Sequence, residues 1–212
     1  MIDFLPQLLT VAIIHLLAVM SPGPDFVIVT KNSLSYSRKI GTYTALGVAL
    51  GIIVHVTYSL FGIGFLISKS IILFTIIKLL GAFYLIWIGV KALRSKPSKI
   101  ENDLTPIKKE KDMTSLGAIK NGFLVNVLNP KATLFFLALF TQVISPATPK
   151  AIQLIYGIEM TIATFVWFSV VAYFFSHSKL KVKIQKIAHH IDKITGLALI
   201  ALGIKVALSS KN

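Results

Sequence analysis

The chain has 212 residues, of which 55% are hydrophobic and only 14% charged, and its mean hydropathy is +0.78. A soluble domain carries about a quarter charged residues, so the surplus of apolar side chains indicates a protein that lies in a lipid bilayer. The formal net charge of +14 does not indicate nucleic-acid binding, because the basic residues lie in short gaps between apolar runs and not among interleaved aromatics. The lack of Cys excludes disulfides, thiol relays and Cys-based metal sites.

A helix that crosses a membrane needs about 20 mostly apolar residues. Six segments meet this requirement: 4–30, 40–61, 77–93, 116–143, 151–176 and 192–208. The predicted fold class is an all-α integral membrane protein with six transmembrane helices. The first twenty residues contain Asp3, lack Lys and Arg, and have no cleavage pattern before Ser21, which favours an uncleaved first span over a signal peptide.

The first span is interrupted by Ser21-Pro22-Gly23-Pro24-Asp25. Two prolines and a glycine break the hydrogen-bond ladder of a helix, so this span is predicted to consist of two half-helices. A carboxylate inside hydrocarbon costs roughly 3 kcal/mol or more, so a reason for its presence is needed. Asp25 either caps the second half-helix and nothing more, or it also holds a substrate ammonium or a proton.

The fourth span carries a similar break of opposite charge, Asn129-Pro130-Lys131. Lys131 lies too deep to reach water easily, so a partner is expected: Asp25 or a substrate carboxylate. The alternative is a Lys that reaches the interface along a tilted helix. Asn129 is expected to cap the helix or to donate an amide hydrogen bond. Broken helices with polar groups at membrane depth are typical of the places where transporters hold their cargo.

Segments 78–91 and 193–205 share a pattern: Lys-x-x-Gly, an apolar run and Gly-x-Lys. With three spans in each half, the second copy must cross the membrane in the opposite sense. The pattern therefore predicts two inverted three-helix repeats within one membrane domain, 1–94 and 115–212, joined by a polar cytoplasmic linker, 95–114. The alternative is that two apolar helices with small residues look alike by chance.

Lys and Arg gather in the first, third and fifth gaps between spans, which predicts that these gaps are cytoplasmic and that both termini lie outside. Segment 180–191 places apolar residues on one helical face opposite Lys and His residues. It is predicted to be an amphipathic helix on the inner leaflet.

The remaining polar and small residues in the spans have less specific interpretations. Glu159 is a lone acid in the fifth span, either a second proton site or a vestibule residue. His15 and His55 have no nearby third ligand for a metal, so hydrogen-bonded core positions are expected. Gly47-x-x-x-Gly51 permits close helix packing, within one chain or in a homodimer.

On three of these motifs the chain resembles the LysE/RhtB family of bacterial amino-acid exporters. The resemblance covers the whole length and rests on Ser21-Pro22-Gly23-Pro24-Asp25, Lys78-x-x-Gly81-Ala82-x-Tyr84-Leu85-x-x-x-Gly89 and Asn129-Pro130-Lys131-Ala132. It implies a protein of the bacterial cytoplasmic (inner) membrane that exports small amino acids or related metabolites from the cytoplasm in exchange for protons. It gives no role to Glu159.

The residues themselves favour a secondary transporter that works by alternating access and runs on an ion or substrate gradient, with no cofactor and no catalytic residue. Proton antiport is what the resemblance implies. The substrate- and proton-binding residues are expected at the two breaks: Ser21, Pro22, Gly23, Pro24, Asp25, Asn129, Pro130 and Lys131. The alternative is a channel or carrier for another small polar solute or ion. A channel would need a continuous polar stripe, and a membrane enzyme would need clustered acids and bases. The sequence shows neither, and it has no nucleotide-binding glycine loop.

Overall fold

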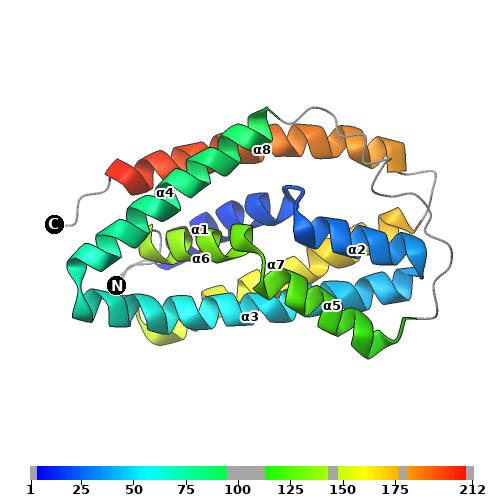
Figure 1. Cartoon of the computed structure of the whole chain (residues 1–212), viewed down its shortest axis with the longest axis horizontal. Helices are drawn as coiled ribbons and strands as arrows, with labels where there is room; N and C mark the ends of the chain where they lie inside the picture. The colour runs from blue at the N-terminus through cyan, green and yellow to red at the C-terminus, as the bar shows by residue number, and fades with distance from the viewer. Residues whose placement is uncertain (1–3, 95–112, 143–147, 177–180, 209–212) are drawn as a thin grey trace.

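The computed structural model describes residues 4–94, 113–142, 148–176 and 181–208. Within these residues the chain forms eight α-helices and no strand (Figure 1), which confirms the all-α prediction. In chain order the helices are α1 (Phe4–Met20), α2 (Pro24–Ser35), α3 (Arg38–Lys69), α4 (Ile71–Leu93), α5 (Ser115–Val127), α6 (Pro130–Gln142), α7 (Lys150–Phe175) and α8 (Lys181–Leu208).

Two pairs of helices are bent at the predicted breaks. The axes of α1 and α2 differ by 56°, and those of α5 and α6 by 58°. Pro24 begins α2 and Pro130 begins α6, the position where proline is tolerated because the missing N–H would have no partner anyway. Gly23 is the N-cap of α2, with no side-chain capping bond. Asp25 therefore lies in the first turn, and the prediction that it caps α2 is wrong.

The described residues include three helical segments long and apolar enough to cross a membrane: Arg38–Gly62, Thr75–Leu93 and Lys150–Phe175. The number rises to five if each bent pair counts as one span. Side chains of α8 are described only from Lys193 on, so the sixth span and the amphipathic face predicted for 180–191 stay predictions. The predicted linker, apart from residues 113 and 114, lies outside the described residues.

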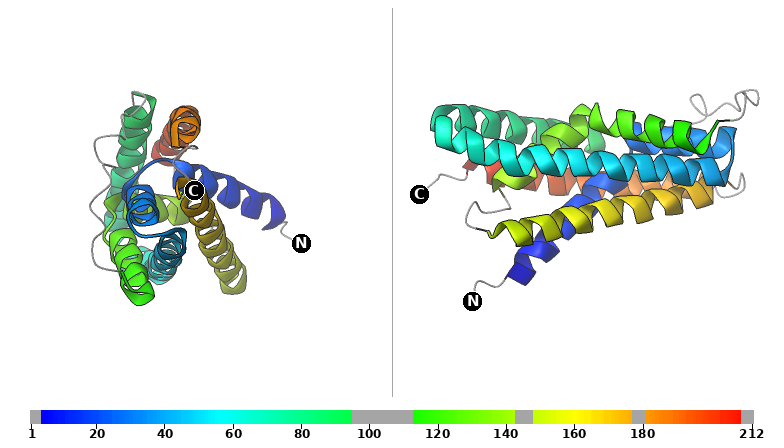
Figure 2. Two further views of the ribbon diagram at one scale, coloured as in Figure 1. Left: turned by 90° about the vertical axis from the view of Figure 1, so that its right-hand side faces the viewer. Right: turned by 90° about the horizontal axis from the view of Figure 1, so that it is seen from below.

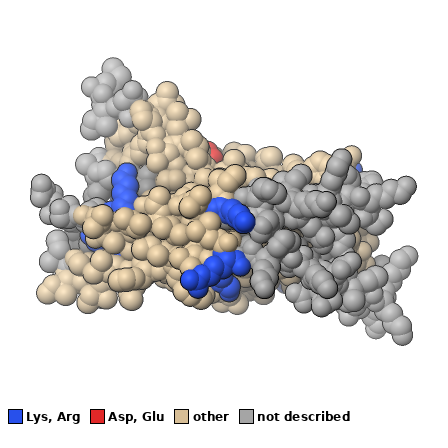
Figure 3. All heavy atoms as spheres, turned by 90° about the horizontal axis from the view of Figure 1, so that it is seen from above, with Lys and Arg blue, Asp and Glu red and all other residues tan. Residues whose placement is uncertain are grey.

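The helices follow one long axis, and α1 leans away from the bundle toward its N-terminal end (Figure 2). This lean leaves Leu5, Leu9 and Ile13 more than half exposed. Large apolar side chains are also exposed along α4 and α7. On the face seen in Figure 3, the described surface is mostly neither basic nor acidic, with a few basic groups and a small acidic spot. Such a surface suits lipid and not water.

Glycines let α3 lie against α5. A Cβ at Gly47 would collide with the carbonyl of Ile119, and one at Gly122 with the carbonyl of Thr44. Gly51 makes room in the same way for the side chain of Asn126. The Gly47-x-x-x-Gly51 pattern therefore packs helices within one chain, and a homodimer stays a prediction.

Gly122→Ala is expected to destabilise the protein by about 1–3 kcal/mol, because the added methyl meets the backbone of α3, which cannot move aside. The measurement is the thermal unfolding midpoint of the purified protein in detergent. Gly62→Ala is the matched control, since a Cβ at Gly62 would meet nothing within 4 Å. An equal effect of both substitutions would contradict this account of the α3–α5 contact.

Apolar residues form two separate clusters inside the bundle. The first, called the α6 cluster, includes Phe135, Phe136 and Leu139 of α6 together with residues of α1, α3, α4, α7 and α8. The second, called the α2 cluster, joins Phe26 and Val29 of α2 to residues of α3 and α7. The two broken pairs meet between these clusters, so polar groups at the breaks lie between two apolar layers.

Candidate functional site

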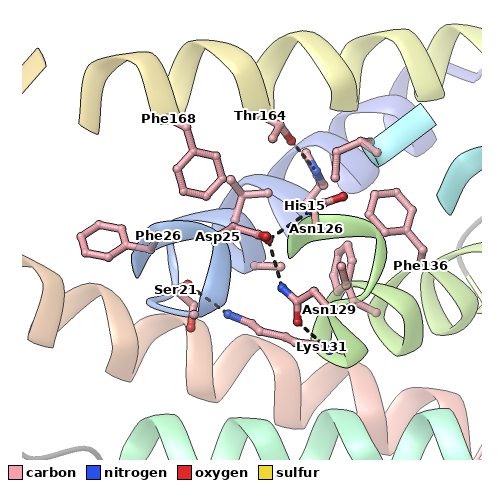
Figure 4. Close-up of a pocket in the computed structure, with 16 residues that line it drawn as sticks. His15, Ser21, Asp25, Phe26, Asn126, Asn129, Lys131, Phe136, Thr164 and Phe168 are labelled. Carbon is pink, nitrogen blue, oxygen red and sulfur yellow. Dashed lines mark hydrogen bonds between the residues drawn. The ribbon is translucent and has the colours of Figure 1, made fainter. Parts of the chain in front are cut away.

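A small cavity lies where the two breaks meet (Figure 4). Its polar lining comes from α1, from both breaks with the helix ends beside them, and from α7: His15, Ser21, Asp25, Asn126, Asn129, Lys131 and Thr164. The space open to the centre of a water molecule is about 40 Å³. At roughly 10–15 Å³ for each water, this space holds about three waters and is too small for a whole amino acid.

The Asp25 carboxylate is held by amides of the opposite break. Its Oδ2 accepts hydrogen bonds from Asn126 Nδ2 and Asn129 Nδ2, each at 3.1 Å. Its Oδ1 is buried and has no hydrogen-bond partner among the described residues. Asp25 also lies in the first turn of α2, where the positive end of the helix dipole stabilises a negative charge.

Lys131 makes the reciprocal contact from α6 to the first break. Its Nζ donates a 3.0 Å hydrogen bond to the carbonyl of Ser21, directly after the last residue of α1. A cation is favoured at this negative end of a half-helix. Its charge also acts on the Asp25 carboxylate. A Cβ at Gly23 would lie 3.5 Å from Nζ, an ordinary van der Waals distance, so the Lys131 side chain passes directly beside the first break.

The second break is fixed by two further sets of bonds. Asn129 Oδ1 accepts from the backbone N–H of Lys131 at 3.0 Å, so Asn129 caps α6 as the sequence predicted and also holds Asp25. His55 Nε2 bonds the carbonyl of Asn126 at 3.0 Å, and its Nδ1 lies 2.7 Å from the hydroxyl of Tyr58. Since a carbonyl only accepts, Nε2 must carry a proton. His55 thereby orients the end of α5, which carries Asn126.

His15 and Thr164 line the cavity from α1 and α7. Both are fully buried, and His15 Nε2 lies 3.3 Å from Thr164 Oγ1. The imidazole lies beside two aromatic rings, with centroids 6.2 Å from Phe135 and 6.0 Å from Phe136. His15 is therefore a buried, hydrogen-bonded residue as expected, but it also forms part of the cavity wall.

The structure brings five predicted residues to the cavity: Ser21, Gly23, Asp25, Asn129 and Lys131. The three predicted prolines, Pro22, Pro24 and Pro130, form the breaks that create it.

Glu159 is placed elsewhere. It lies in a separate groove of about 610 Å³ between α1 and α7, among exposed apolar residues such as Ile155 and Ile162. Its Oε2 has no partner among the described residues.

Asn126 is the contact that the sequence reasoning missed. It lies three residues before Asn129 and so on the same side of the chain, one helical turn away, which was the available signal. Thr164 carried no signal of this kind, because it is one of several hydroxyl residues in α7. Among the described residues, no group of three His, Cys, Asp or Glu side chains could hold a metal ion.

Several membrane-length helices, two of them broken around a buried polar cavity, define a multi-pass membrane protein with the construction of a transporter. The sequence profile described as "LysE type translocator" matches residues 16–210. The chain belongs to this LysE family of translocators, as its motifs predicted.

Similar proteins are known from several bacteria. The chain is 33% identical to the threonine efflux protein of Salmonella typhi over 94% of its own length and 97% of that protein. It is 32% identical to the threonine efflux protein of Escherichia coli K12, over 95% of its own length and 97% of that protein. It is 35% identical to an uncharacterized membrane protein of Bacillus subtilis, YrhP, over 90% of its own length and 93% of that protein. No solved structure matches the chain.

Proposed function

We propose that this protein exports threonine or a similar small amino acid from the bacterial cytoplasm. The observation that carries the proposal is the meeting of the two breaks, where a carboxylate, two amides and an ammonium surround one cavity. A zwitterion needs an anionic and a cationic partner a short distance apart. Asp25 would hold the ammonium of the amino acid, and Lys131 would hold its carboxylate. The substrate named for the two efflux relatives supports this choice of cargo.

Alternating access is the proposed mechanism. The cavity offers only about 40 Å³, with Phe136 of the α6 cluster and Phe26 and Phe168 of the α2 cluster in its wall. An amino acid can bind only if the cavity widens, which requires these clusters to move apart, and a carrier opens the two sides in turn. The two half-helix pairs supply hinges for this movement, since each already bends at a break of two or three residues.

Proton exchange is the proposed source of energy. Asp25 is buried between two amide donors, and its second oxygen is unoccupied by any described donor. A proton on that oxygen would remove the charge that holds an ammonium, so a proton and a cargo molecule would compete for the same carboxylate. Competition of this kind couples export of the amino acid to import of the proton.

The proposal is completed by the architecture: six spans in two inverted repeats, in the inner membrane, with both termini outside. The directions of α4 and α8 support the inverted repeats. A Cβ at Gly89 would lie 2.6 Å from the carbonyl of Gly196, and one at Gly203 would lie 2.8 Å from that of Ala82, so α4 and α8 run antiparallel. Equivalent helices of two inverted repeats pack in this way. The basic residues of the first, third and fifth gaps support the orientation.

Counterflow in proteoliposomes tests the proposal. Vesicles that contain the full chain and unlabelled threonine are expected to accumulate external labelled threonine above its equilibrium level, because a carrier exchanges the two. A channel, the alternative function, would let both pools equilibrate without such accumulation. A panel of other small amino acids in the same assay defines the range of cargo. No exchange of any of them would overturn the proposed function.

A further inference from the structure

We infer that His15 and Thr164 form a subsite that selects amino acids with a side-chain hydroxyl group. The inference rests on the proposed function and adds to it, because the two breaks contact only the ammonium and carboxylate common to all amino acids. His15 and Thr164 come from α1 and α7, and in Figure 4 Thr164 lies on the opposite side of Asp25 from Lys131. A side chain of the cargo would therefore point toward them.

The hydrogen-bond inventory of His15 is incomplete. Nε2 has Thr164 Oγ1 at 3.3 Å, whereas Nδ1 is buried and has no partner among the described residues. A buried polar atom without a hydrogen bond carries a desolvation penalty, and a ligand group that bonds to it removes this penalty and so gains binding free energy. Because His15 lines the cavity, a cargo molecule that widens it comes into contact with this ring.

The chemistry of the pair identifies the group that fits. A neutral imidazole has one donor and one acceptor nitrogen, and the Thr164 hydroxyl can donate to or accept from Nε2. Nδ1 can thus present either role, so a ligand group needs at least one donor or acceptor to bond to it. A hydroxyl group can pair with Nδ1 in either tautomer, whereas an aliphatic side chain can pair with neither.

The rest of the wall fits the carbon atoms of a small hydroxy amino acid. Ala18, Val19, Ile52 and Ala132 line the same cavity and are apolar. They would contact a methyl or methylene group. Glu159 of α7 lies in the separate groove and is not available to a cationic side chain. The subsite therefore favours threonine over valine, which has the same shape but carries a methyl in place of the hydroxyl.

The test compares labelled threonine and valine in counterflow by proteoliposomes of the full chain. The wild type is expected to prefer threonine by roughly ten-fold or more, the worth of about one well-formed hydrogen bond. His15→Phe and Thr164→Val are each expected to bring this ratio close to one while valine exchange continues. Thr164→Ser keeps a hydroxyl and is expected to restore the preference.

Thr161→Val is the matched control. Thr161 lies on the same helix, bonds to the carbonyl of Gly157 and does not line the cavity, so the ratio is expected to stay at the wild-type value. Equal transport of threonine and valine by the wild type would overturn the inference. An unchanged ratio in His15→Phe would also overturn it, and Thr164→Val serves in its place if His15→Phe fails to insert. Either result, with exchange by the wild type, would leave the proposed exporter function intact. Absence of all exchange by the wild type would refute both the exporter function and the subsite.

Discussion

Asp25→Asn is expected to lower threonine export by at least about 100-fold. Asn has the shape of Asp, so the substitution removes the negative charge and places an amide between the two amide donors of Asn126 and Asn129. Losing one member of a buried charged contact costs about 2–5 kcal/mol, which supports this magnitude. The measurement is proton-coupled efflux from proteoliposomes, together with the amount of protein inserted in the membrane.

Glu159→Gln is the matched control for this substitution. It makes the same acid-to-amide change in a residue that lies in the groove between α1 and α7, outside the cavity. Efflux by this variant is expected to stay at the wild-type level. Undiminished proton-coupled efflux by Asp25→Asn would show that Asp25 carries neither the cargo nor the proton.

Lys131→Met is expected to raise the KM for threonine by at least about ten-fold. The thioether chain fills much of the space of the Lys stem but cannot bind a carboxylate or the carbonyl of Ser21. Insertion is expected to survive, because an apolar residue replaces a charge within the membrane interior. The measurement is initial efflux rate against internal threonine concentration.

Lys120→Met controls for the loss of a positive charge from the same half of the chain. Lys120 is an exposed residue of α5, and it does not line the cavity. The KM of the Lys120→Met variant for threonine is expected to match that of the wild type. If Lys131→Met also kept the wild-type KM, the cargo carboxylate would have to bind elsewhere, and the proposed arrangement of the zwitterion would be wrong.

The breaks could be predicted from the sequence because proline acts locally. Pro24 and Pro130 remove backbone donors and therefore fix where α2 and α6 begin. The depth of Lys131 in its span also made Asp25 one of its expected partners, and both residues line one cavity.

The partners of these residues could not be predicted in the same way. Lys131 bonds to a backbone carbonyl, which every residue has, so no side-chain pattern marks it. Whether His15 faces lipid, core or cavity depends on the angle between α1 and α7, which no local preference sets. The predicted span 40–61 was also shorter than α3, which ends at Lys69. The segment beyond Phe61 contains glycines, which interrupt the apolar run in the sequence.

The reciprocal bonds between the breaks have a consequence for energy conservation. Asp25 of the first half is bound by Asn126 and Asn129 of the second, and Lys131 of the second by Ser21 of the first. In the proposed exchange cycle, an incoming zwitterion would have to replace these bonds, and a proton on Asp25 would weaken them. The protein with neither cargo nor proton would then be the form least able to change between its two open states. Under the proposed mechanism, the proton gradient would therefore not be dissipated in the absence of an amino acid.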